Sequence, residues 1–129
     1  MASKQQLEAH ADIVLASVEA TADKMQQFCL LWGEIVRPVF ELVKTFTGPK
    51  VDEQLNKLES AADGVCSGNN LQVQKYCTLW DTLHLKGLLK MIQFFTGPKV
   101  DKVLNKFIDL SDALVLFEAN AQATAAATA

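Results

Sequence analysis

Apolar or small residues recur along the first third of the chain at alternating intervals of four and three positions. The series is unbroken from residue 7 to residue 46 and comprises Leu7, Ala11, Val14, Val18, Thr21, Met25, Phe28, Trp32, Ile35, Val39, Leu42 and Phe46. An α-helix repeats every 3.6 residues, so this spacing places all of them on one helical face. No alternation of period two competes with it, and the pattern predicts an all-α fold.

Two features interrupt this long helical stretch. Pro38 removes one backbone hydrogen bond and clashes with the preceding turn, so we expect a long first helix with a kink near Pro38. Thr21 or Asp23 could instead cap the start of a second helix. The apolar phase does not slip at these residues, which favours one helix over residues 4–46 and leaves two helices as the open alternative.

The second half of the chain repeats part of the first half. The heptapeptide FTGPKVD at residues 46–52 recurs 49 positions later, at residues 95–101. The match extends downstream (LNKL at 55–58, LNKF at 104–107) and upstream (FCLLW at 28–32, YCTLW at 76–80). Identity over so many positions predicts two copies of one structural unit, at about residues 25–66 and 71–119.

Each copy contains a Gly-Pro corner. We name residues 47–50 the first corner and residues 96–99 the second corner. Glycine suits the left-handed residue after a helix and proline the first turn of the next, so helices are expected over about 49–65, 71–95 and 98–119. The predicted fold is an antiparallel bundle of four to five helices, built from a duplicated helix-corner-helix unit. It forms one domain over residues 1–119, followed by a flexible Ala/Thr-rich tail at 120–129.

Composition narrows the classes of partner and compartment. The 129 residues are 50% hydrophobic and carry a net charge of −3 without a basic cluster, which argues against nucleic-acid binding. The start of the chain lacks the apolar segment of a secretory signal, and no apolar run approaches the ~20 residues of a transmembrane segment. Three cysteines without scaffold spacing (Cys29, Cys66 and Cys77) favour free thiols and a cytoplasmic location.

No constellation of reactive side chains can be recognised. His10 and His84 are not spaced to bind a metal with each other or with a cysteine, so neither a metal nor a cofactor is expected. No nucleophile and base can be paired from the order of residues, and the chain is predicted not to be an enzyme, with no catalytic residue. The corners offer one binding hypothesis: free amides at a helix start, with Lys50 or Lys99, could hold an anion. The alternative is that each corner is only structural.

The aromatic residues support a second binding hypothesis. Six of them could line an apolar ligand pocket inside the bundle: Phe28, Trp32, Phe40, Tyr76, Trp80 and Phe95. Rings at helical spacing could equally form a packed core.

The apolar surplus suggests the function. Phe94 and Phe95 are adjacent and cannot both point inward, and Phe117 follows Leu114 and Leu116, so some apolar surface should remain exposed. The predicted function is a non-enzymatic interaction module or homo-oligomer that buries this surface against a protein partner. The alternatives are a carrier of a lipid or other apolar small molecule and, third, reversible binding to a membrane surface, suggested by a narrow polar line at Glu34, Arg37, Glu41 and Lys44.

Overall fold

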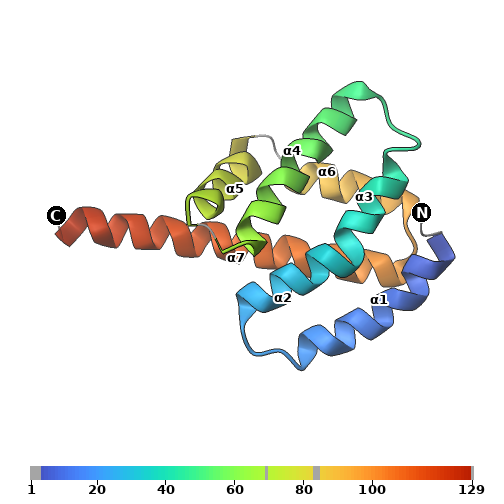
Figure 1. The fold of residues 1–129 in the computed structure, drawn as a ribbon, viewed down its shortest axis with the longest axis horizontal. Coiled ribbons are helices and arrows are strands. Elements are labelled where there is room, and N and C mark those ends of the chain that lie inside the picture. Colours follow the sequence, from blue (N-terminus) through green and yellow to red (C-terminus); the bar gives the residue numbers. More distant parts are fainter. Residues whose placement is uncertain (1–3, 69, 83–84, 129) are drawn as a thin grey trace.

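The computed structural model describes residues 4–68, 70–82 and 85–128, and every regular element within these ranges is helical (Figure 1). The all-α prediction is therefore confirmed. In chain order the elements are α1 (Lys4–Glu19), α2 (Lys24–Leu31), the π-helical turn η1 (Trp32–Val36), α3 (Arg37–Val43), α4 (Pro49–Cys66), α5 (Asn70–Thr82), α6 (Leu85–Ile92), the 3-10 turn η2 (Gln93–Phe95) and α7 (Pro98–Thr128).

Of the two alternatives for residues 4–46, the favoured single helix is wrong, and a second helix starts after Asp23. Helix α1 ends at Glu19, and the Asp23 side chain caps α2 by accepting a hydrogen bond from the Met25 amide at 2.8 Å. The first amides of a helix have no partner within the helix, and this cap provides one. It therefore lowers the free-energy cost of starting a new helix after Asp23. The chain reverses between the two helices, so that α1 and α2 form a hairpin (Figure 1). The apolar phase is preserved because Val18 and Phe28 both enter the core.

The distortion expected near Pro38 is a π-helical turn. The Arg37 amide donates to the Trp32 carbonyl, five residues earlier, in η1. Pro38 follows directly and has no amide hydrogen to offer to the turn before it. A wider turn at this position accommodates the missing bond, as π turns commonly do in otherwise regular helices.

Both corners lead into a helix that begins with proline, at Pro49 of α4 and Pro98 of α7. Gly48 is extended (φ −84°, ψ 175°), so the left-handed conformation expected there is not adopted. Among the described residues, positive φ occurs at Gly68 (φ 86°), which follows the end of α4 and allows the chain to turn.

Helix α7 is the element around which the others gather. It packs against α1, α2 and α5, and its first half lies beside α1 (Figure 1). The helix continues to Thr128, beyond the end expected at residue 119, and its last part projects away from the other helices (Figure 1). The flexibility of residues 120–129 stays a prediction.

Candidate functional site

The same tryptophan–aspartate contact occurs in both sequence copies. The Trp32 indole donates a hydrogen bond from Nε1 to Asp63 Oδ1 at 2.8 Å. The Trp80 indole donates to Asp112 Oδ1 at 2.9 Å. Each indole is buried while its N–H reaches a half-buried carboxylate on the following long helix. The indole of one helix is thereby fixed to the helix after the corner.

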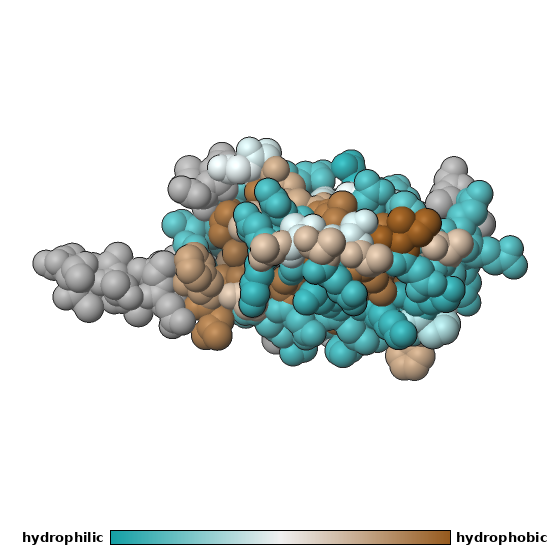
Figure 2. Space-filling model, turned by 90° about the horizontal axis from the view of Figure 1, so that it is seen from below, coloured by the Kyte–Doolittle hydropathy of each residue, from teal (hydrophilic) through white to brown (hydrophobic). Residues whose placement is uncertain are grey.

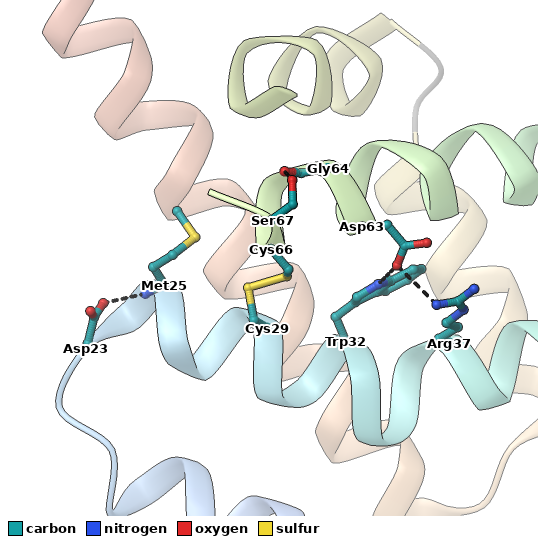
Figure 3. Close-up of a disulfide and its surroundings, with 9 residues drawn as sticks. All are labelled: Asp23, Met25, Cys29, Trp32, Arg37, Asp63, Gly64, Cys66 and Ser67. Atoms are coloured by element: carbon teal, nitrogen blue, oxygen red, sulfur yellow. Dashed lines mark hydrogen bonds and ion pairs between the residues drawn. A yellow bond between two sulfur atoms is a disulfide. The ribbon is translucent and has the colours of Figure 1, made fainter. Parts of the chain in front are cut away.

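A cation completes each of these contacts. Arg37 Nη1 lies 3.3 Å from Asp63 Oδ1, and Lys86 Nζ lies 3.0 Å from Asp112 Oδ2. Figure 3 shows the first set, with Trp32 and Arg37 both directed at Asp63. Each carboxylate thus binds both an indole and a cation. These bonds hold helices together and leave neither carboxylate as a free acid or base.

The predicted pocket residues pack against one another. Ring centroids of Trp80 and Tyr76 are 6.0 Å apart, those of Tyr76 and Phe28 5.3 Å, and Trp32 and Phe40 5.5 Å. Phe107, an aromatic residue besides those six, stacks on Phe28 at 4.8 Å and on Trp32 at 6.0 Å. The two indoles are thus connected through intervening rings that occupy the interior.

Phe95, the sixth predicted pocket residue, has a side chain that lies outside the described residues. Tyr76 also carries a polar contact: its hydroxyl hydrogen-bonds to Ser111 Oγ at 2.6 Å in the fully buried core. Burial raises the pKa of Tyr76 well above its ordinary value.

The second corner holds a carboxylate from the same chain. Glu8 Oε2 accepts hydrogen bonds from the amides of Lys99 at 2.9 Å and Val100 at 3.2 Å, at the start of α7. Lys99 Nζ lies 2.6 Å from Asp12 Oδ2, and this hydrogen bond raises the pKa of Lys99. Free amides and the helix dipole attract anions to a helix start. The anions at the predicted Lys99 site are therefore two carboxylates of α1, those of Glu8 and Asp12.

Close approach of Glu8 depends on the glycine of this corner. A Cβ atom on Gly97 would lie 1.7 Å from Glu8 Oε1, so a larger residue would displace the carboxylate. Two acids one helical turn apart, Glu8 and Asp12, were the signal in the sequence. They were missed because nothing in the sequence places α1 beside residue 99.

The first corner has the same residues without a bound carboxylate. Lys50 is exposed, and neither its amide nor its ammonium group has a partner among the described residues. A Cβ atom on Gly48 would meet nothing within 4 Å. At both corners the threonine hydroxyl donates to the aspartate five residues on, from Thr47 to Asp52 and from Thr96 to Asp101. The prediction of an anion site at Lys50 stays a prediction.

An apolar groove lies between the start of α2 and the middle of α7. Its volume is about 590 Å³, and its lining comprises Asp23, Lys24, Met25, Phe28, Leu110, Ala113, Leu114, Leu116 and Phe117. Leu116 is 64% exposed and Phe117 69% exposed. Figure 2 shows apolar surface gathered where α7 extends beyond the other helices. The sequence pointed to surplus apolar surface at Phe94, which is also exposed, and at Phe117 after Leu114 and Leu116, but it did not place α2 beside this part of α7.

The prediction of three free thiols is wrong. Cys29 of α2 and Cys66, the last residue of α4, form a disulfide, with Cα atoms 5.6 Å apart (Figure 3). The two cysteines are 37 positions apart, and only the return of α4 to α2 brings them together. Cys77 is a free, buried thiol whose pKa burial raises to about 11.

The disulfide belongs to the first copy alone. Cys77 occupies the position that corresponds to Cys29, but Val115 stands where a counterpart of Cys66 would be. The cytoplasmic location rested partly on free thiols, so this part of its basis is lost.

No protein family, curated protein or solved structure matches the chain. Within the part of the chain that the structure describes, no three His, Cys, Asp or Glu side chains are grouped to hold a metal ion. None of the described helices combines the length and apolarity needed to cross a bilayer.

Proposed function

We propose that this chain is a non-enzymatic interaction module that associates with a second copy of itself through the groove between α2 and α7. The observation that carries the proposal is the pairing of a hollow with protruding apolar side chains, Leu116 and Phe117, on the same surface. Contiguous exposed apolar surface of this kind marks association sites in water-soluble proteins.

A second copy of the chain fits this surface because the surface carries both a groove and side chains that could fill such a groove. In a two-fold dimer the same patch meets itself, so each Phe117 would enter the groove of the other copy. The groove also holds adjacent opposite charges, Asp23 and Lys24, at the start of α2. Adjacent opposite charges on a self-complementary surface can pair across a two-fold interface.

We also propose that the bundle is a duplicated helix-corner-helix unit in antiparallel arrangement. The repeated indole–carboxylate bonds support it, since Trp32 with Asp63 and Trp80 with Asp112 are matching pairs of the two copies. A further support is that Phe28 and Tyr76, which occupy equivalent positions, contact each other. Contact between equivalent residues is what a two-fold relation produces.

The test of self-association is light scattering after size exclusion, over a range of chain concentrations, for the wild type and for Phe117→Asp. We expect the wild type to move from monomer to dimer, and the variant to dissociate at least about tenfold more readily because a buried carboxylate lacks a partner. Phe94→Asp is the matched control: Phe94 is 87% exposed and lies in η2, outside the groove lining. A monomeric wild type at every concentration would contradict the proposal.

The same groove supports the alternative of an apolar small-molecule carrier. Its volume of about 590 Å³ falls within the range of small-molecule sites, about 300 to 1,000 Å³. Native mass spectrometry of the monomer would then show an added mass that Phe117→Asp removes. Reversible membrane-surface binding draws less support, because Glu34, Arg37 and Lys44 of the polar line pair with residues of α1 and α4.

A further inference from the structure

The two corners form an internal comparison of one binding site with and without its ligand. Residues 46–52 and 95–101 are identical, and both lead into a long helix with proline as its first residue. At the second corner, the next two amides and the lysine side chain bind Glu8 and Asp12 of α1. At the first corner, the corresponding groups of Lys50 and Val51 have no acceptor among the described residues.

The residues that follow each corner also differ in burial, and those after the first corner are less covered. On α7, Val100 is 1% exposed and Val103 is fully buried, and α1 packs against this helix. The corresponding residues of α4, Val51 and Gln54, are only half-buried. The first corner therefore exposes backbone amide donors, a lysine ammonium group and part of an apolar face. The equivalent groups of the second corner are covered by α1.

We propose that the first corner binds an amphipathic helix of a partner protein that carries a glutamate and, four residues later, an aspartate. The glutamate accepts hydrogen bonds from the Lys50 and Val51 amides, the aspartate pairs with Lys50 Nζ, and the apolar edge of the helix covers Val51. Acids at positions i and i+4 lie on one helical face, as Glu8 and Asp12 do in α1. Charge complementarity thus specifies the partner.

We assign the partner helix to another protein, because α1, which carries Glu8 and Asp12, already binds the second corner of its own molecule. Glu8 of α1 is bound to the start of its own α7. The site is also separate from the proposed dimer groove, whose lining comes from residues 23–28 and 110–117. The two proposals can therefore fail independently.

The probe is a fluorescent peptide with the sequence of residues 4–19, titrated with the full-length chain and followed by anisotropy. We expect saturable binding that weakens with salt, as for charged groups at an exposed site. Gly48→Ala should weaken it at least about tenfold, because the new Cβ atom takes the place of the incoming carboxylate, as a Cβ at Gly97 would for Glu8. The fold should tolerate this variant because a Cβ atom at Gly48 meets nothing within 4 Å.

Two matched controls accompany this measurement. Lys75→Ala removes an exposed lysine of another helix, α5, and should leave peptide affinity unchanged. A peptide with glutamine in place of the residue corresponding to Glu8 should bind at least about tenfold more weakly, since a charge-assisted bond is lost. Circular dichroism establishes that each variant of the chain is folded.

Three outcomes would overturn the proposal. They are no peptide binding by the wild-type chain, equal binding by wild type and Gly48→Ala, and a fall in the chain's own molar mass caused by Gly48→Ala. Equal binding would place the peptide at the second corner after displacement of α1. A change in molar mass would assign the corner to a second copy, whereas the Phe117→Asp measurement tests the groove separately.

Discussion

Tyr76 is the one tyrosine of the chain, and its hydroxyl is buried against Ser111. Burial raises its pKa, so the folded chain retains the phenolic proton above pH ~10, where the unfolded chain releases it. The unfolded state then binds fewer protons, and the free energy of unfolding should decrease as the pH rises above about 10.

Urea unfolding at about pH 8 and about pH 11 measures this effect, with tyrosinate absorbance as an independent readout. Cys77 contributes with the same sign, since its pKa is also raised, so Tyr76→Phe is the comparison that isolates the tyrosine. The variant should lose less stability between the two pH values than the wild type. Tyrosinate absorbance from the folded chain at about pH 10 would refute the explanation.

Individual residues were the hardest part to predict from the sequence. Cys29 and Cys66 gave no spacing signal, and Glu8 gave no indication of a partner 91 positions away. Both contacts depend on how whole helices return to one another. By contrast, the aromatic residues were found because their helical spacing already places them on an inward face.

At the scale of elements, the two corners allow a direct comparison of one substitution in two surroundings. Gly97→Ala should destabilise the chain by about 1 kcal/mol more than Gly48→Ala, because only the former displaces a capping carboxylate. Any cost of alanine at the helix start itself is common to both variants. Chemical unfolding of the two variants measures the difference.

A double-mutant cycle identifies the cause of that difference. In a Glu8→Ala background the two glycine substitutions should have equal effects, since no carboxylate remains to be displaced. A difference that persists without Glu8 would mean that another feature of the second corner is responsible.

Helix positions were predicted better than helix continuity. The starts of α4 and α7 at Pro49 and Pro98 follow from proline at the first helical position. The sequence favoured a continuous helix across the break before α2, because periodicity shows only which residues are buried. The periodic apolar residues of α1 and of α2 are both buried, although the two helices form a hairpin. Local capping by Asp23, rather than phase, decided this boundary.

At the scale of the whole molecule, the disulfide links α2 to the end of α4 across 37 positions. The loss of loop entropy in the unfolded chain implies a stabilisation of about 4 kcal/mol for a loop of this size. Reduction should therefore lower the free energy of unfolding by about that amount, which is a large fraction of the ~5–15 kcal/mol typical of a domain.

Urea unfolding with and without reductant measures this contribution. A variant with Cys29→Ser and Cys66→Ser should match the reduced wild type and should not respond to reductant. Thiol counting on the unfolded, unreduced chain should find one reactive cysteine, Cys77. Three thiols would show that the disulfide does not form, and only that result would restore the original argument for a cytoplasmic location.

The disulfide also makes the two corners unequal toward proteolysis. A protease that cuts the chain between Cys29 and Cys66, for example at the first corner, leaves both fragments covalently joined. A cut at the second corner lies outside that closed ring, so α7 would be retained by packing alone. The covalent integrity of a nicked molecule therefore depends on which of two identical heptapeptides is cleaved.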